Sequence, residues 1–105
     1  GGPVDCDFRS TWVDGVGSRR VLDEMWPVVR DSVTASLAVA PGDVAGAVRL
    51  LAERCATVAE GAGAVSVAAA VLHAERIVRD CGGDADVVNV VCVVSGSGIG
   101  SGTLV

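Results

Sequence analysis

The sequence predicts an α/β fold, a small parallel sheet with packed helices in the order helix, strand, helix, helix, strand. Three observations lead to this prediction. Residues 33–39 alternate between apolar and polar side chains, residues 87–94 form an almost unbroken apolar run, and the segments before and between them carry apolar residues at helical spacing. Because two strands connected through helices are normally parallel and joined by a right-handed crossover, we expect 33–39 and 87–94 to share one sheet.

The chain of 105 residues has the length of one compact domain. Residues 1–20 show no sustained periodicity and are interrupted by proline and glycine, so we expect an irregular lead-in. Residues 21–95 are predicted to form a single α/β domain. Residues 96–105 form a tail rich in glycine and serine.

The first predicted helix takes Asp23 as its N-cap, which places Pro27 in the first turn, where its missing N–H group is no loss. The alternative is a start near Ser18, and Pro27 would then kink the helix. One face of this helix is apolar and is formed by Val21, Leu22, Met25, Val28 and Val29, with Trp26 at its border.

The second predicted helix follows the turn 40–43, in which Asp43 is the N-cap candidate. Its apolar face comprises Val44, Ala47, Val48, Leu51, Cys55 and Val58. The sequence Glu60-Gly61-Ala62-Gly63 should end it, because closely spaced glycines disfavour a helix interior and let backbones approach a neighbour.

A third helix, rich in alanine, is predicted over 64–79 and ends at the glycines 82 and 83. The apolar run 87–94 that follows is typical of a strand buried on both faces of a parallel sheet. Two strands alone leave unpaired edges. Either another chain completes this sheet, or the chain contains a further strand.

The composition excludes several classes of function. Half of the residues are apolar, the net charge is −5, and the eight basic residues are scattered arginines, so we expect no nucleic-acid partner. The chain contains no lysine, which excludes any mechanism that requires a Schiff base with a protein lysine. Part of the apolar surface should instead meet another protein chain.

The four cysteines, Cys6, Cys55, Cys81 and Cys92, lie far apart in the sequence. No C-x-x-C pair is present and no histidine lies beside a cysteine, so we expect buried reduced thiols and no metal site. The sequence shows no signal peptide, and the apolar stretch 62–72 is too short to span a membrane. We therefore expect a cytoplasmic protein without a membrane partner.

Three motifs resemble one known family. They are Val13-Asp14-Gly15-Val16, the run from Val58 to Ala64, and the strand end Val93-Val94-Ser95-Gly96. In this order and at these distances they resemble the threonine dehydratase and serine racemase group of tryptophan synthase β-like enzymes, which depend on pyridoxal phosphate. The resemblance covers roughly residues 11–100 and implies a fragment of a larger three-layer α/β domain, the C-terminal part of the catalytic domain.

The resemblance also implies roles for two segments, with pyridoxal phosphate as the cofactor. Ser95, followed by Gly96, matches the serine that hydrogen-bonds the pyridine nitrogen and keeps it unprotonated. Glu60, Gly61, Ala62 and Gly63 match the segment that lies against the edge of the cofactor ring. Without the resemblance, Ser95 is a turn residue after a strand and Glu60 is a solvated helix end.

The chain departs from the family in what it lacks. It contains neither the family's lysine motif nor its glycine-rich phosphate loop, and Ser95-Gly96-Ser97-Gly98 stands where the family has Ser-Gly-Gly-Asn. We therefore expect a fragment that is not catalytic alone and that self-associates as a homo-oligomer. The alternatives are one component of a threonine or serine dehydratase-like lyase completed by another chain, and a small-ligand binding module.

Two further features are better explained without catalysis. The tail 96–102 lacks the final glycine of the Gly-x-Gly-x-x-Gly fingerprint, and too few residues follow it to form the helix that a dinucleotide site needs. His73 is the single histidine, and no Gly-x-Ser-x-Gly motif supplies a nucleophile for it. We expect His73 to be a surface or hydrogen-bonded core residue.

Overall fold

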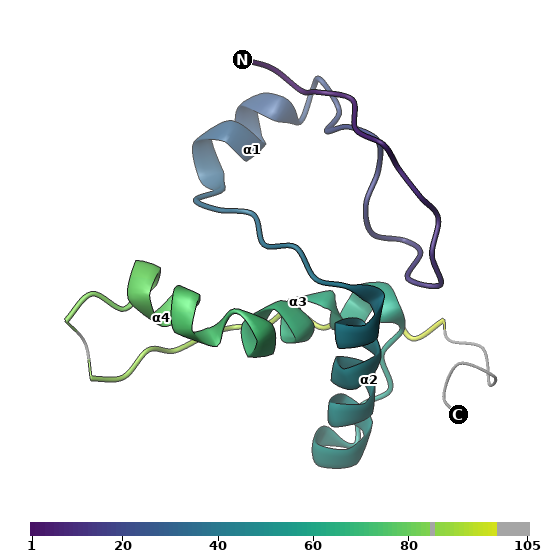
Figure 1. Ribbon diagram of the computed structural model, residues 1–105, viewed down its shortest axis with the longest axis vertical. Helices are drawn as coiled ribbons and strands as arrows, with labels where there is room; N and C mark the ends of the chain where they lie inside the picture. The colour runs from purple at the N-terminus through teal and green to yellow at the C-terminus, as the bar shows by residue number, and fades with distance from the viewer. Residues whose placement is uncertain (85, 99–105) are drawn as a thin grey trace.

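The computed structural model describes residues 1–84 and 86–98. Within them the chain forms four helices and no strand, so the predicted α/β fold with a parallel sheet is wrong. The helices are α1 (Trp26–Ser32), α2 (Pro41–Cys55), α3 (Gly61–Leu72) and α4 (Ala74–Cys81) (Figure 1).

The two predicted strands, 33–39 and 87–94, are present as irregular chain that lies on α3 and α4. The His73 ring nitrogen Nε2 donates to the Ala38 carbonyl oxygen at 2.8 Å, and the Ser66 hydroxyl donates to the Val93 carbonyl oxygen at 2.6 Å. Alternating apolar and polar residues, or a continuous apolar run, indicate side chains that are favourable in a strand. A strand also needs a neighbouring backbone to pair with. The described residues give neither segment such a neighbour.

The core lies between α2 and α3, which pack against each other. Small side chains on α3 let the two helices approach closely, because alanine leaves little bulk between their backbones. The predicted face of α2 is confirmed from Val44 to Leu51, whereas Cys55 and Val58 are exposed. The buried residues are Val44, Ala47, Val48 and Leu51 of α2, Ala64 and Ala68 of α3, and Ala59 between the helices.

Helix α2 begins earlier than predicted. Its N-cap is Ala40, and Asp43 is the third helical residue. The Asp43 carboxylate accepts a hydrogen bond from the Ala40 N–H group at 3.1 Å, which satisfies one of the free donors at the helix start. Helix α1 begins at Trp26 with Pro27 in its first turn, as predicted, but its N-cap is Met25 and not Asp23.

The predicted helix 64–79 is two helices. Helix α3 ends at Leu72, α4 begins at Ala74, and the two are bent by 74° at His73. Gly82 ends α4, as predicted. Of the helices in 1–84 and 86–98, none is by itself long and apolar enough to cross a membrane, and α3 and α4 reach the required length only as this bent pair.

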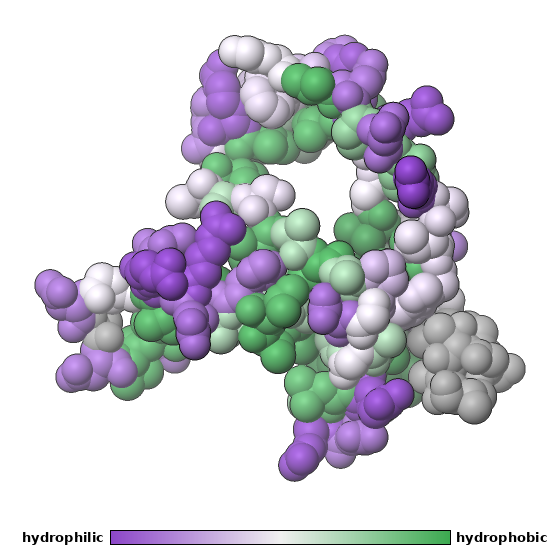
Figure 2. Space-filling model, in the orientation of Figure 1, coloured by the Kyte–Doolittle hydropathy of each residue, from purple (hydrophilic) through white to green (hydrophobic). Residues whose placement is uncertain are grey.

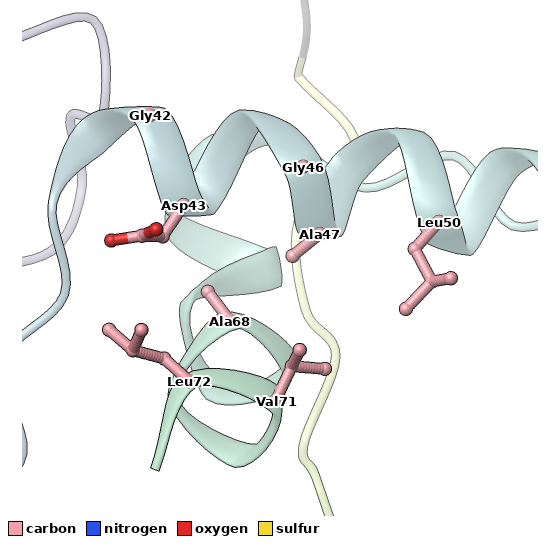
Figure 3. A pocket seen from close by; sticks show the side chains of 8 residues that line it. All are labelled: Gly42, Asp43, Gly46, Ala47, Leu50, Ala68, Val71 and Leu72. Carbon is pink, nitrogen blue, oxygen red and sulfur yellow. The ribbon is translucent and has the colours of Figure 1, made fainter.

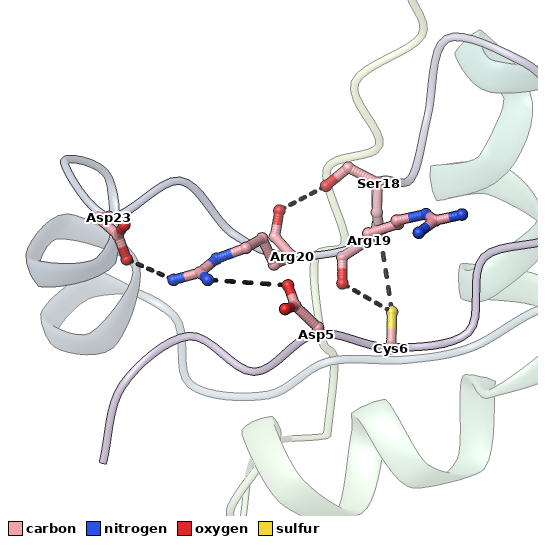
Figure 4. A network of polar contacts seen from close by, with 6 residues as sticks. All are labelled: Asp5, Cys6, Ser18, Arg19, Arg20 and Asp23. Carbon is pink, nitrogen blue, oxygen red and sulfur yellow. Dashed lines mark hydrogen bonds and ion pairs between the residues drawn. The ribbon is translucent and has the colours of Figure 1, made fainter.

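The lead-in 1–20 forms a loop closed at its base. The Cys6 N–H group donates to the Arg19 carbonyl oxygen at 2.8 Å, and Arg20 pairs with Asp23 at 2.6 Å and with Asp5 at 3.7 Å (Figure 4). These exposed ion pairs contribute little stability each. Together with the Cys6–Arg19 hydrogen bond, they hold the two ends of the loop near each other. The tip of the loop reaches α3.

The molecule is open between α1 and the α2–α3 core. Helix α1 has no buried residue and packs against no other described helix. Figure 2 shows a gap through the molecule that is bordered largely by apolar residues. The Cα radius of gyration is 15.3 Å, against about 13 Å for a compact domain of this length.

Candidate functional site

The structure brings the two predicted site segments together at the N-terminus of α3. Glu60 is the N-cap of α3, and its N–H group donates to the Gly96 carbonyl oxygen at 3.1 Å. Sequence spacing alone does not predict this contact, because the two segments lie far apart in the chain. Glu60, Gly63, Ser95 and Gly96 are therefore neighbours in space.

Gly63 makes this close approach possible. A Cβ atom on Gly63 would occupy the position of the Ser95 carbonyl oxygen, and backbone atoms cannot move aside as a flexible side chain can. Gly63 is itself buried. The helix and the chain after residue 94 can meet here only because position 63 carries no side chain.

The Glu60 side chain packs against the same loop. The Cβ position of Gly96 is occupied by the Glu60 carboxylate, and that of Gly98 lies 3.1 Å from Glu60 Oε2. Gly96 also has a φ of +72°, a conformation that favours glycine. Glu60 is half-buried at the positive end of α3, where its charge is favourable. It is not the solvated helix end of the simpler interpretation.

Ser95 is exposed, and its carbonyl group faces Gly63. Among residues 1–84 and 86–98, the Ser95 hydroxyl has no hydrogen-bond partner. It is the Ser95 carbonyl group, and not a side-chain contact, that ties this residue to the start of α3. Ala62 faces away from this point and toward the lead-in, since its Cβ atom lies 3.6 Å from the Cβ position of Gly15.

Trp12 is a site neighbour that the sequence did not single out. Its ring atom Cζ3 lies 2.7 Å from the position that a Cβ on Gly61 would take. The indole thus packs on the first residue of α3, directly after Glu60. Sequence reasoning could have selected Trp12 because it is an aromatic residue directly before the Val13–Val16 motif of the lead-in.

The hollows of the surface lie elsewhere. One of about 370 Å³ lies between α2 and α3 (Figure 3), and neither it nor two further hollows are lined by Glu60 or Ser95. The first is mostly apolar, and Asp43 is its one charged lining residue. Its lining comprises Gly42, Asp43, Gly46, Ala47, Leu50, Ala68, Val71 and Leu72.

The histidine and the cysteines have ordinary surroundings. His73 is half-buried and hydrogen-bonded to Ala38, which matches the prediction of a satisfied residue. The prediction of buried thiols is wrong for Cys6, Cys55 and Cys81, which are exposed, while Cys92 is partly buried. All four are free thiols.

Comparison with known families identifies the class of protein. The family described as pyridoxal-phosphate dependent enzyme matches residues 1–103, nearly the whole chain. The chain belongs to this family, which confirms the resemblance stated from the three motifs.

A curated relative narrows the comparison. The chain is 37% identical over 93 residues to the protein described as L-threonine dehydratase biosynthetic IlvA, from Bacillus subtilis (strain 168). The match covers 89% of this chain and 20% of the relative, so the chain spans about one fifth of the length of the curated relative. No solved structure gives a significant match.

The site residues fit one edge of pyridoxal phosphate and not the whole group. Ser95 is exposed, but the Glu60 carboxylate packs against the backbone of Gly96 and Gly98. Nothing in the sequence supplies a lysine for the cofactor aldehyde. Ligand sites usually bury most of the ligand surface, and a single edge cannot do so. No catalytic step follows from these residues alone.

Proposed function

We propose that this chain is a fragment of a threonine dehydratase-like catalytic domain that is not catalytic by itself and self-associates. The family match and the 37% identity to a threonine dehydratase support the relationship. One observation supports the claim that the fragment is not catalytic by itself. The segment at Glu60 meets the segment at Ser95, yet the chain contains no lysine to join to a cofactor.

The proposal assigns the two segments to one wall of a cofactor site. Pyridoxal phosphate, where bound, serves as an electron sink. The Ser95 hydroxyl would hydrogen-bond the ring nitrogen, beside Gly96. The segment Glu60, Gly61, Ala62 and Gly63 would lie along the ring edge, with Gly63 fixing its distance from Ser95.

Self-association is supported by the amount of apolar side chain left exposed. Large apolar residues are exposed in the lead-in, on α1, on α3 and along the last segment. Apolar side chains exposed over several elements are a common mark of surfaces that contact another protein. A second copy of the chain would cover part of it.

A second candidate is one component of a threonine or serine dehydratase-like lyase that another chain completes. The observation that favours it is the contact between the Glu60 and Ser95 segments, which forms only one wall of a site. The missing lysine and phosphate loop would then come from the complementing chain. For both candidates we propose a cytoplasmic location, which is supported only by the description of the relative as a biosynthetic enzyme.

Activity and binding assays of the purified chain test the proposal. We expect no conversion of L-threonine above the rate of free pyridoxal phosphate, because no lysine is present. We also expect no saturable binding of pyridoxine 5′-phosphate. This probe lacks the aldehyde, so it cannot react with the N-terminal amine.

Turnover by the chain alone would contradict the proposal. Saturable binding that Ser95→Ala weakens and the control Ser36→Ala does not would favour the second candidate. Ser36 is an exposed serine outside the site. Loss of one hydrogen bond of ordinary strength should weaken such binding by roughly two- to tenfold.

A further inference from the structure

The segment 87–94 leaves one face and most of its backbone groups without a partner among the described residues, although the Val93 carbonyl oxygen accepts a hydrogen bond from the Ser66 hydroxyl. None of its N–H or C=O groups makes a backbone hydrogen bond to another residue of 1–84 or 86–98. Val88 and Cys92 face the helices, since Val88 contacts Gly82 and Cys92 Sγ lies 3.7 Å from the Ser66 carbonyl oxygen. Val87, Val91 and Val93 face outward, and Val91 is 90% exposed.

The chain exposes more surface than a compact folded monomer of the same mass. Its surface measures 7766 Å², whereas a folded monomer of this mass exposes about 5,400 Å². The excess, roughly 2,300 Å², lies in the range of surface that obligate dimers bury. This excess is spread over the whole open chain, so segment 87–94 supplies only part of it, but its size leaves room for contact with a second copy.

Charge selects the orientation of two copies. The segment 87–94 carries no charged residue, and the acidic Asp84 and Asp86 precede it. Parallel pairing of two copies in register would place the acidic ends side by side. Antiparallel pairing separates them and keeps the valine-rich backbones opposite each other. A two-fold axis then relates the copies, so the same segment serves both sides.

We propose that residues 87–94 pair in antiparallel register with the same segment of a second copy of this chain, and that the outward valines form the centre of the interface. This inference rests on the self-association proposed above and names its surface. The backbone groups supply the hydrogen bonds, and Val91 lies next to the two-fold axis. The hollow between α2 and α3 lies outside this interface.

Matched lysine variants test this surface by sedimentation velocity. Val91→Lys should raise the dimer dissociation constant at least tenfold, because it places two ammonium groups beside the axis. Val71→Lys is the control, since Val71 is 63% exposed on α3 and lines the hollow. It should leave the dissociation constant unchanged. Hydrogen–deuterium exchange of the unsubstituted chain should show slow amides within 87–94.

Each contrary result has a distinct meaning. A monomeric unsubstituted chain would contradict both the self-association and its surface. A dimer that Val91→Lys leaves intact, that Val71→Lys breaks, or whose 87–94 amides exchange rapidly would contradict the surface alone. Large open-ended assemblies would also contradict it, because a two-fold pairing closes on two copies.

Discussion

Gly63 is the residue on which the candidate site depends most directly. Its missing side chain lets the Ser95 carbonyl group approach α3, and Glu60 closes over Gly96 beside it. Gly46 offers a contrast on α2, since a Cβ atom there meets nothing within 4 Å. Substitutions at the two glycines therefore distinguish the effect of close backbone approach at Gly63 from the general effect of glycine on helix stability.

Substitution of these glycines by alanine should change stability in opposite directions. Gly63→Ala should lower the free energy of unfolding by about 1–3 kcal/mol, because the added methyl group meets backbone that cannot yield. Gly46→Ala should raise it by up to about 1 kcal/mol through better helix propensity. Urea denaturation at one protein concentration measures both. A neutral Gly63→Ala variant would show that the two segments do not meet.

The elements show what a single sequence can specify and what it cannot. The buried face of α2 and the stop at Gly82 follow from helical spacing and from glycine chemistry, which are local properties. The sheet does not follow, because pairing requires a second backbone that 33–39 and 87–94 lack in the described residues. The bend at His73 was also missed, since residues 64–79 contain no glycine or proline to mark it.

The site could be predicted only through the family resemblance. Nothing in the spacing of Glu60 and Ser95 indicates that they are neighbours, and the three motifs suggested it. Trp12 was not predicted to be a site residue. It lies at the site because it packs on Gly61, and no sequence pattern indicates that contact. Whether these residues face a cofactor stays a prediction.

Neighbouring leucines on α2 test where the core lies. Leu51 is 7% exposed and Leu50 is 40% exposed. Leu51→Ala should lower the free energy of unfolding by about 2–3 kcal/mol through lost burial and a cavity, whereas Leu50→Ala should cost less than about 1 kcal/mol. Thermal or urea unfolding followed by circular dichroism measures both. Equal losses would contradict the α2–α3 core described above.

At the scale of the whole molecule, the chain is a small core with large uncovered surfaces. The fully buried residues lie on α2, α3 and the turn between them. The lead-in reaches this core through Trp12 and Val13, while α1 stands apart across an open gap (Figure 2). A domain of this size buries only about two thirds of its unfolded surface even when compact. The stability of this chain should therefore depend on association, and should rise with protein concentration.

Sedimentation velocity of the unsubstituted chain over a dilution series, with and without pyridoxine 5′-phosphate, tests the account most directly. The account predicts a species of twice the 10.5 kDa chain mass that persists at micromolar concentration, with the ligand left behind the protein boundary. A chain that sediments as a monomer throughout the series would contradict it.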